Sequence, residues 1–215
     1  MRFRIETLAE ELKQRLNDTL PGSDAHEPLR AVPTGELRPT FNHRMPPKPG
    51  SVLILLYEDE DGLIKFPLTK RPDYLGTHGG QVSLPGGKME PGEDHIATAL
   101  REGEEEIGVH PYQIKVLGTL SQFFVVPSNF LVTPVLAYAT QPPQFVPDPK
   151  EVVRILTGTV EDLIREDAVK TRQIMAAKMF PMMAPHFEIE GEIVWGATAM
   201  MLNEFRLIMQ SITRL

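Results

Sequence analysis

Strand-length apolar segments, separated by helical ones, constrain most strongly what this chain can fold into. Residues 51–57 read Ser-Val-Leu-Ile-Leu-Leu-Tyr, an apolar run that predicts a buried strand. An acidic turn over 58–62 separates this run from a second strand-like segment over 63–70, so the two predict a hairpin. Further strands are expected over 81–84, 114–124 and 130–140.

Helices are expected before, between and after these strands. In the first 17 residues, Ile5, Leu8, Leu12 and Leu16 lie three or four positions apart, which predicts an amphipathic helix over 4–17. The other helices are expected over 93–107, 160–165, 169–178 and 198–212. Mixed strands with helices between and after them predict an α/β or α+β sandwich.

Proline divides the chain. Seven of its 20 prolines fall between residues 21 and 49. Each proline fixes φ and removes a backbone donor, so this stretch is expected to be an extended arm rather than a helix or a central strand. We therefore expect an N-terminal helix and proline-rich arm over 1–49, followed by one domain over 50–215.

Charge and cysteine content exclude several classes of function. Lysine and arginine number 22 and acids 29, so the formal charge is 22 − 29 = −7, which argues against nucleic acid or an anionic membrane as a partner. The absence of cysteine excludes disulfides, thiolate zinc sites and a cysteine nucleophile. No apolar stretch approaches the ~18 residues of a membrane helix, and no targeting signal is visible, so a cytoplasmic location is expected.

The segment over 87–109 is the most informative part of the sequence. Pro91 and Gly92 precede its helix, and Glu93 with Asp94 are expected in the first turn, where acids meet the positive end of the helix dipole. Gly108 is suited to end the helix in the left-handed conformation.

Three glutamates near the end of this helix share one face. Glu102 is four residues from Glu106 and three from Glu105, a spacing that brings their carboxylates together. A glutamate-rich helix end is often only a solvated surface. Packed carboxylates are nevertheless stabilised by a cation, and oxygen ligands of this kind suit Mg²⁺ or Mn²⁺. Arg101 is placed to hold Glu93 or a neighbour by a fork-like ion pair.

Taken together, these residues resemble the Nudix box, G-x5-E-x7-R-E-U-x-E-E-x-G-U. The seven matching residues are Gly87, Glu93, Arg101, Glu102, Glu105, Glu106 and Gly108. Gly103 departs from the pattern, because an aliphatic residue is expected there, and it suggests close packing. The resemblance implies the Nudix fold, a mixed β-sheet sandwiched between helices, and hydrolysis of a nucleoside diphosphate linked to another moiety.

The same resemblance implies roles for individual residues. It makes Glu102, Glu105 and Glu106 the catalytic ligands of Mg²⁺ or Mn²⁺, with the backbone carbonyl of Gly87 as a further ligand. Supporting roles fall to Glu93, Arg101 and Gly86. The general base stays open between Glu105 and Glu151, the latter in a proline-flanked loop, where it is alternatively only a helix-starting residue.

Residues 68–87 resemble the signature of coenzyme A pyrophosphatases within the Nudix superfamily. The matching residues are Leu68, Thr69, Arg71, Gly80, Pro85, Gly86 and Gly87. Gly76 departs where that subfamily has arginine, and Pro67, Pro72 and Leu84 also differ. The resemblance implies cleavage of coenzyme A or its thioesters to 3′,5′-ADP and 4′-phosphopantetheines. Arg71 and Lys70 are candidates for substrate contacts, with solvated surface residues as the alternative. His78 is a further candidate, and as a loop histidine it is alternatively inert.

Two other hypotheses remain. Gly76 favours another Nudix hydrolase acting on ADP-ribose, a dinucleotide or a nucleotide sugar. A non-catalytic Nudix ligand sensor is disfavoured, because its box glutamates would be broken. The substrate is expected to be a nucleotide-containing small molecule. Four methionines either line a pocket for a pantetheine arm or belong to the core or the interface of a homodimer, namely Met175, Met179, Met182 and Met183.

Overall fold

The main body is a mixed sheet. A computed structural model describes residues 4–36, 38–73, 79–177 and 179–213. Eight strands form this sheet in the order β4–β3–β2–β8–β6, with β5 beside β2, β7 beside β8 and β9 beside β3. They are β2 (Lys48–Glu58), β3 (Ile64–Lys70), β4 (Val82–Ser83), β5 (Gly86–Lys88), β6 (Ile114–Thr119), β7 (Phe123–Val125), β8 (Phe130–Ala139) and β9 (Arg154–Thr159). The pair β2–β8 is parallel and the others are antiparallel, so the mixed sheet is confirmed.

The predicted hairpin is present. Tyr57 pairs with Lys65 and Glu58 with Ile64 across β2 and β3. The segment expected as one strand over 114–124 is instead split into β6 and β7. The strand β9 was not expected from the sequence.

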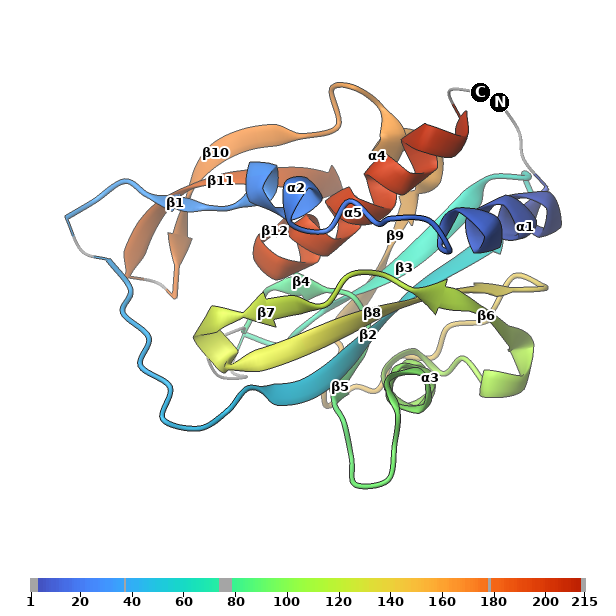
Figure 1. Cartoon of the computed structure of the whole chain (residues 1–215), viewed down its shortest axis with the longest axis horizontal. Coiled ribbons are helices and arrows are strands. Elements are labelled where there is room, and N and C mark those ends of the chain that lie inside the picture. Colours follow the sequence, from blue (N-terminus) through green and yellow to red (C-terminus); the bar gives the residue numbers. More distant parts are fainter. Residues whose placement is uncertain (1–3, 37, 74–78, 178, 214–215) are drawn as a thin grey trace.

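Helices cover both faces of the sheet (Figure 1). They are α1 (Ile5–Arg15), α2 (Ser23–His26), α3 (His95–Ile107), α4 (Val160–Ile164) and α5 (Gly196–Thr213). On one face, Leu53 and Val135 of the sheet pack with Ala99 of α3. On the other, Ile54 and Leu136 belong to the core that contains α1 and α5. The sandwich predicted from the sequence is confirmed. None of the helices in the described ranges is long and apolar enough to cross a membrane.

A second, smaller sheet corrects one prediction. It has the order β1–β11–β10, with β12 beside β11, and consists of β1 (Val32–Pro33), β10 (Lys170–Ala176), β11 (Phe180–Ile189) and β12 (Glu192–Trp195). The helix expected over 169–178 is wrong, because that segment contains β10, whose seven residues all pair with β11. β-branched Thr171 and Ile174 suit a strand, and long-range pairing outweighs the local pattern.

The methionines divide between core and surface. Met182 of β11 is buried, whereas Met175, Met179 and Met183 are exposed. They therefore do not line one pocket together. The homodimer that these residues suggested stays a prediction.

The proline-rich arm is partly folded. Residues 23–29 form α2 and a 3-10 helix over Glu27–Leu29, so the expectation of an extended chain is wrong there, whereas β1 is an extended strand at the edge of its sheet. The remainder up to β2 runs along the molecule without helix or strand in its described residues (Figure 1). Buried His26 places its Nε2 3.1 Å from Oε2 of Glu204 in α5, which fastens this segment to the core. The division at residue 49 stays a prediction.

Candidate active site

The site is built on the helix α3 and the loop before it. Asp94 caps this helix by accepting a 2.7 Å hydrogen bond from the Ala97 N–H. The sequence predicted Glu93 and Asp94 in the first turn of the helix. Asp94 is instead the N-cap, so both residues precede the helix. Gly108 ends the helix at φ 74°, which confirms the left-handed termination.

Gly103 explains why the box departs from its usual aliphatic residue. A Cβ at this position would lie 2.8 Å from Cδ2 of Leu53, a fully buried residue of β2. The glycine therefore lets α3 approach the sheet closely, as the sequence suggested. Close approach keeps the glutamates of the last turns next to the backbone of β5.

Arg101 ties the loop to the helix. Its Nε donates to Glu93 Oε1 at 2.7 Å, and its Nη2 donates to Glu93 Oε2 at 3.2 Å, which confirms the fork-like ion pair. Hydrogen bonding from Arg101 is the largest cause lowering the pKa of Glu93 to about 2. The same Nη2 donates to the carbonyl of Lys88 at 3.0 Å. This guanidinium therefore holds the strand β5, the following loop and α3 in one arrangement.

Arg101 also lies between two of the three box glutamates. Its Nη1 donates to Glu102 Oε1 at 2.8 Å and to Glu105 Oε2 at 2.9 Å. Burial is the largest cause raising the pKa of Glu102. A Cβ on Gly87 would lie 2.4 Å from Glu102 Oε1, so only glycine lets this carboxylate approach the loop backbone so closely. Glu105 by contrast is mostly exposed.

Glu106 is the most buried of the three, with 3% of its surface exposed. Its Oε2 accepts a 3.3 Å hydrogen bond from the Gly86 N–H, and its Oε1 lies 3.5 Å from Nη2 of Arg71. Burial is the largest cause raising the pKa of Glu106 to about 7, and the negative charges of Glu102 and Glu151 act in the same direction. The nearby guanidinium of Arg71 acts against this rise, and further positive charge beside Glu106 would stabilise its ionised form.

The donor set fits a hard divalent ion. All three side chains offer carboxylate oxygens, which Mg²⁺ and Mn²⁺ prefer. Within the described part of the chain, no three acidic or histidine side chains are arranged so that they could hold an ion as they stand. Glu102 and Glu105 both accept a hydrogen bond from Arg101 Nη1, and exposed Glu105 has the most freedom to turn away from it. The carbonyl oxygen of Gly87 lies against Gly50 of β2, where a Cβ would be 2.8 Å away.

The expected substrate contacts separate. Arg71 reaches Glu106, on the α3 side of the sheet. Lys70 instead donates to Glu192 Oε1 of β12 at 2.6 Å. Phe66 and Leu68 alternate with the same period along β3 and so lie on the same face of the strand as Lys70. Both pack in the core on the α5 side. Lys70 therefore points away from the glutamates. His78 and Gly76 lie outside the described residues.

Glu151 comes from a different part of the chain. It lies in the loop between β8 and β9, where the Asp148 N–H donates to the carbonyl of Glu106 at 3.1 Å. This bond holds the loop against the end of α3. The charge of Glu151 raises the pKa of both Glu102 and Glu106, so its carboxylate lies near them. Sequence reasoning missed Asp148 as the anchor, because its backbone makes the contact.

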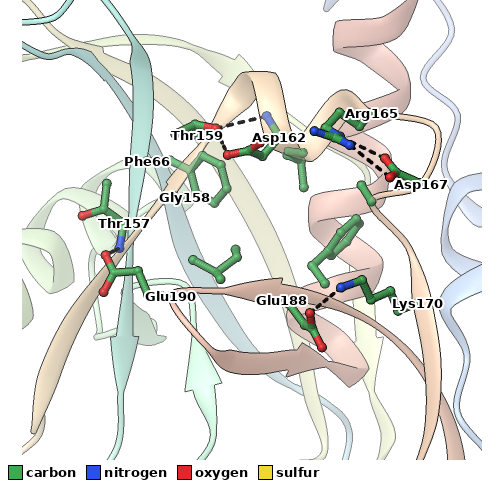
Figure 2. A pocket seen from close by; sticks show the side chains of 14 residues that line it. Phe66, Thr157, Gly158, Thr159, Asp162, Arg165, Asp167, Lys170, Glu188 and Glu190 are labelled. Carbon is green, nitrogen blue, oxygen red and sulfur yellow. Dashed lines mark hydrogen bonds and ion pairs between the residues drawn. The ribbon is translucent and has the colours of Figure 1, made fainter.

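A cavity of about 400 Å³ lies elsewhere, between β9, α4 and β11 (Figure 2). Phe66 and Phe187 contribute apolar lining, and charged side chains surround them. Arg165 pairs with Asp167 and Lys170 with Glu188, as the dashed lines show. None of the box glutamates lines this cavity, which makes it separate from the candidate site.

Comparison with known proteins identifies the family of this domain. A family model described as the NUDIX domain matches residues 47–192. The chain is 35% identical over 167 residues to "Nudix hydrolase 15, mitochondrial" of Arabidopsis thaliana, covering 73% of this chain and 56% of the relative. It is 31% identical to "Nudix hydrolase 3" of Caenorhabditis elegans, covering 72% and 70%. The chain thus spans little more than half the length of some curated relatives.

Two further comparisons bear on substrate and fold. A peroxisomal coenzyme A diphosphatase of Mus musculus is 34% identical over 125 residues, covering 58% of this chain and 52% of the relative. A solved Nudix hydrolase from M. smegmatis, RenU, has a TM-score of 0.53 at 16% identity, over 85% of this chain and 94% of that one, which shows the fold alone. The names of the Arabidopsis and mouse relatives include the words mitochondrial and peroxisomal, so the cytoplasmic location expected for this chain stays a prediction.

Proposed function

The chain belongs to the Nudix family, and we propose that it hydrolyses the pyrophosphate bond of a nucleoside diphosphate derivative with the help of Mg²⁺ or Mn²⁺. One observation carries this proposal. Buried Glu106 and largely buried Glu102 lie against the backbone of Gly86 and Gly87, where their charges repel each other and a divalent ion would stabilise both.

The chemistry follows from the charge of the substrate. Pyrophosphate oxygens repel a nucleophile, and a divalent ion offsets that charge and lowers the pKa of the attacking water. Glu102 and Glu106 would hold the ion, with Glu105 joining them after leaving Arg101. Arg71, next to Glu106, is placed to neutralise a phosphate oxygen. The ion pair of Arg101 with Glu93 keeps the loop and helix aligned.

Glu151 is the general base that the geometry favours. Glu105 is engaged by Arg101 and, as a proposed ligand, would be bound to the ion. Glu151 forms no ion pair with another described residue, and its negative charge raises the pKa of both Glu102 and Glu106. A carboxylate near the metal and free of it can accept a proton from the attacking water.

Glu151→Gln tests this assignment. We expect kcat to fall by about 10²- to 10⁴-fold, the usual contribution of a general base, with the Mg²⁺ requirement unchanged. Glu105→Gln should instead raise the Mg²⁺ concentration needed for half-maximal rate, because it removes a ligand. Both follow from steady-state rates over a Mg²⁺ titration. If the Glu151 variant is restored by excess Mg²⁺, its role as base is wrong.

Coenzyme A or one of its thioesters is the substrate that we propose. The segment over 68–87 carries most of the coenzyme A signature, and the similarity to the mouse coenzyme A diphosphatase supports the same class. ADP-ribose is the second candidate, because Gly76 replaces an arginine that would contact substrate in that signature.

A substrate panel separates these candidates. Turnover of coenzyme A, ADP-ribose and NADH is measured with Mg²⁺ and with Mn²⁺, and the products are identified by mass spectrometry. We expect kcat/KM to be highest for coenzyme A, with 3′,5′-ADP and 4′-phosphopantetheine as products. Coenzyme A cleaved no faster than ADP-ribose would remove the substrate assignment. Binding of all three without cleavage would favour a ligand sensor.

A further inference from the structure

Three aromatic rings from two distant segments gather on the surface. Phe41 and His43 belong to the proline-rich arm, and Phe124 belongs to β7. The rings of Phe41 and His43 are nearly parallel, at 12° with centroids 6.4 Å apart, and Phe124 meets His43 edge-on at 6.4 Å. Phe41 is 43% exposed and Phe124 39%. We call these three residues the aromatic platform.

The arm holds its two rings in place. His43 Nε2 lies 2.6 Å from the carbonyl of Val126, just after β7. Asn129 Nδ2 donates to the carbonyls of Met45 and Pro46 at 3.1 and 3.3 Å. These bonds fix the arm on the turn between β7 and β8, and prolines restrict it further. The platform is thus organised before anything binds to it, which lowers the entropic cost of binding.

The platform lies on the same face of the sheet as the glutamates. Phe124 pairs with Leu131 of β8, so the two side chains share a face. Val135 lies four residues further along β8 and so points the same way. It packs with Ala99 of α3 in the core on that side. Val132, which follows Leu131 in β8 and therefore points to the opposite face, belongs to the core on the α5 side.

The distance to the metal loop suits a nucleotide. Leu131 pairs with Pro49 of β2, and the carbonyl of Pro49 accepts a 3.1 Å hydrogen bond from the N–H of Met89. The path from Phe124 through Leu131 and Pro49 to Met89 crosses three neighbouring backbone segments, each about 4.8 Å apart. The backbone of Phe124 therefore lies about 15 Å from the loop that follows Gly87. An extended nucleoside diphosphate spans a distance of this order between its base and its second phosphate.

We propose that the aromatic platform binds the purine base of the nucleotide whose pyrophosphate the glutamate site cleaves, an inference that rests on the proposed function. A base offers a π-face to Phe41 and Phe124, which a pantetheine chain does not. Phe41 and Phe124 are uncharged rings and thus suit a neutral base. Phosphates attached to the base would extend along the sheet toward Gly87 and α3.

Two uncleavable probes isolate the contribution of the base. Adenosine 5′-(α,β-methylene)diphosphate carries the base, and methylenediphosphonate carries only the phosphorus groups. Calorimetry with Mg²⁺ gives the Kd of each probe. We expect Phe124→Ala to weaken binding of the adenosine probe about tenfold or more and to leave the diphosphonate unchanged, whereas Phe124→Trp keeps the affinity. Phe41→Ala should act in the same direction.

Tyr112→Ala is the matched control. Tyr112 is an exposed aromatic residue stacked on His110 beyond the end of α3, and its loss should change neither Kd. Unchanged adenosine binding in Phe124→Ala and Phe41→Ala would overturn the platform, as would equal weakening of both probes, or no adenosine binding by the wild type. A wild type that binds adenosine through Phe124 yet cleaves no nucleotide would contradict the proposed function alone.

Discussion

Glu106→Gln should abolish most of the activity and at the same time stabilise the metal-free protein. We expect kcat to fall about a hundredfold or more, because the variant loses a charged group that we propose as a metal ligand. The stability gain has a separate origin. The pKa of Glu106 is raised from 4.5 to about 7 by burial, so the folded state resists ionisation of this carboxyl.

The sign of this effect sets the pH at which it is visible. A carboxyl whose pKa is higher in the folded than in the unfolded chain leaves stability intact below pH 4.5 and lowers it as the pH rises toward about 7. At 1.36 kcal/mol per pKa unit, the full loss is about 3 kcal/mol. Glutamine never ionises, so the variant should avoid that loss at pH 8 and show little gain at pH 4.5.

Urea unfolding in EDTA at pH 4.5 and pH 8 measures the stability, and turnover with Mg²⁺ measures the activity. Glu104→Gln is the control, because Glu104 lies on the same helix, is exposed and is outside the box pattern. It should leave both quantities near the wild type. A Glu106→Gln variant that remains active, or that is less stable than the wild type at pH 8, would contradict the role given to this carboxylate.

His26→Ala should cause the largest loss of stability. His26 and Glu204 are both buried, and Glu204 also accepts hydrogen bonds from the N–H groups of Gly22 at 3.0 Å and Ser121 at 3.4 Å. Removing one partner of a buried pair leaves an uncompensated charge, at a cost of about 3–5 kcal/mol. We therefore expect the free energy of unfolding at pH 7 to fall by that amount.

The pH dependence of this pair differs from that of Glu106. Burial acts to raise the pKa of Glu204, but the hydrogen bonds from His26, Ser121 and Gly22 together lower it below 4.5. The stabilisation is therefore present above pH 4.5 and is lost as the pH falls further. Glu27→Gln, which breaks the exposed pair with Arg30, is the control and should cost under about 1 kcal/mol. A similarly small loss in His26→Ala would show that the pair does not anchor the arm.

Much of the site could be predicted from the sequence because its determinants are local. Glycine at 108, the helical spacing of the glutamates and the reach of Arg101 to Glu93 depend on a single helix and the loop before it. The opposite orientations of Lys70 and Arg71 also follow from strand alternation, with Phe66 and Leu68 as the guide. Treating both residues as substrate contacts overlooked that signal.

Other features depend on contacts that no local pattern encodes. The strand β10 exists because β11 pairs with all seven of its residues, and its mostly exposed side chains carry no alternation. The folded part of the arm depends on a long-range contact, because His26 pairs with Glu204 of α5, which lies far along the chain. The bridge from Arg101 to both Glu102 and Glu105 depends on side-chain rotamers, which spacing alone does not determine.

Binding of Mn²⁺ tests the central claim most directly, since it needs no substrate. Electron paramagnetic resonance follows free Mn²⁺ in titrations of the wild type, Glu106→Gln and Glu104→Gln at pH 8. If the box glutamates hold the ion, the wild type and Glu104→Gln should bind Mn²⁺ with the same Kd. Glu106→Gln should bind Mn²⁺ at least about tenfold more weakly. Equal Mn²⁺ affinity in all three proteins would contradict the metal site.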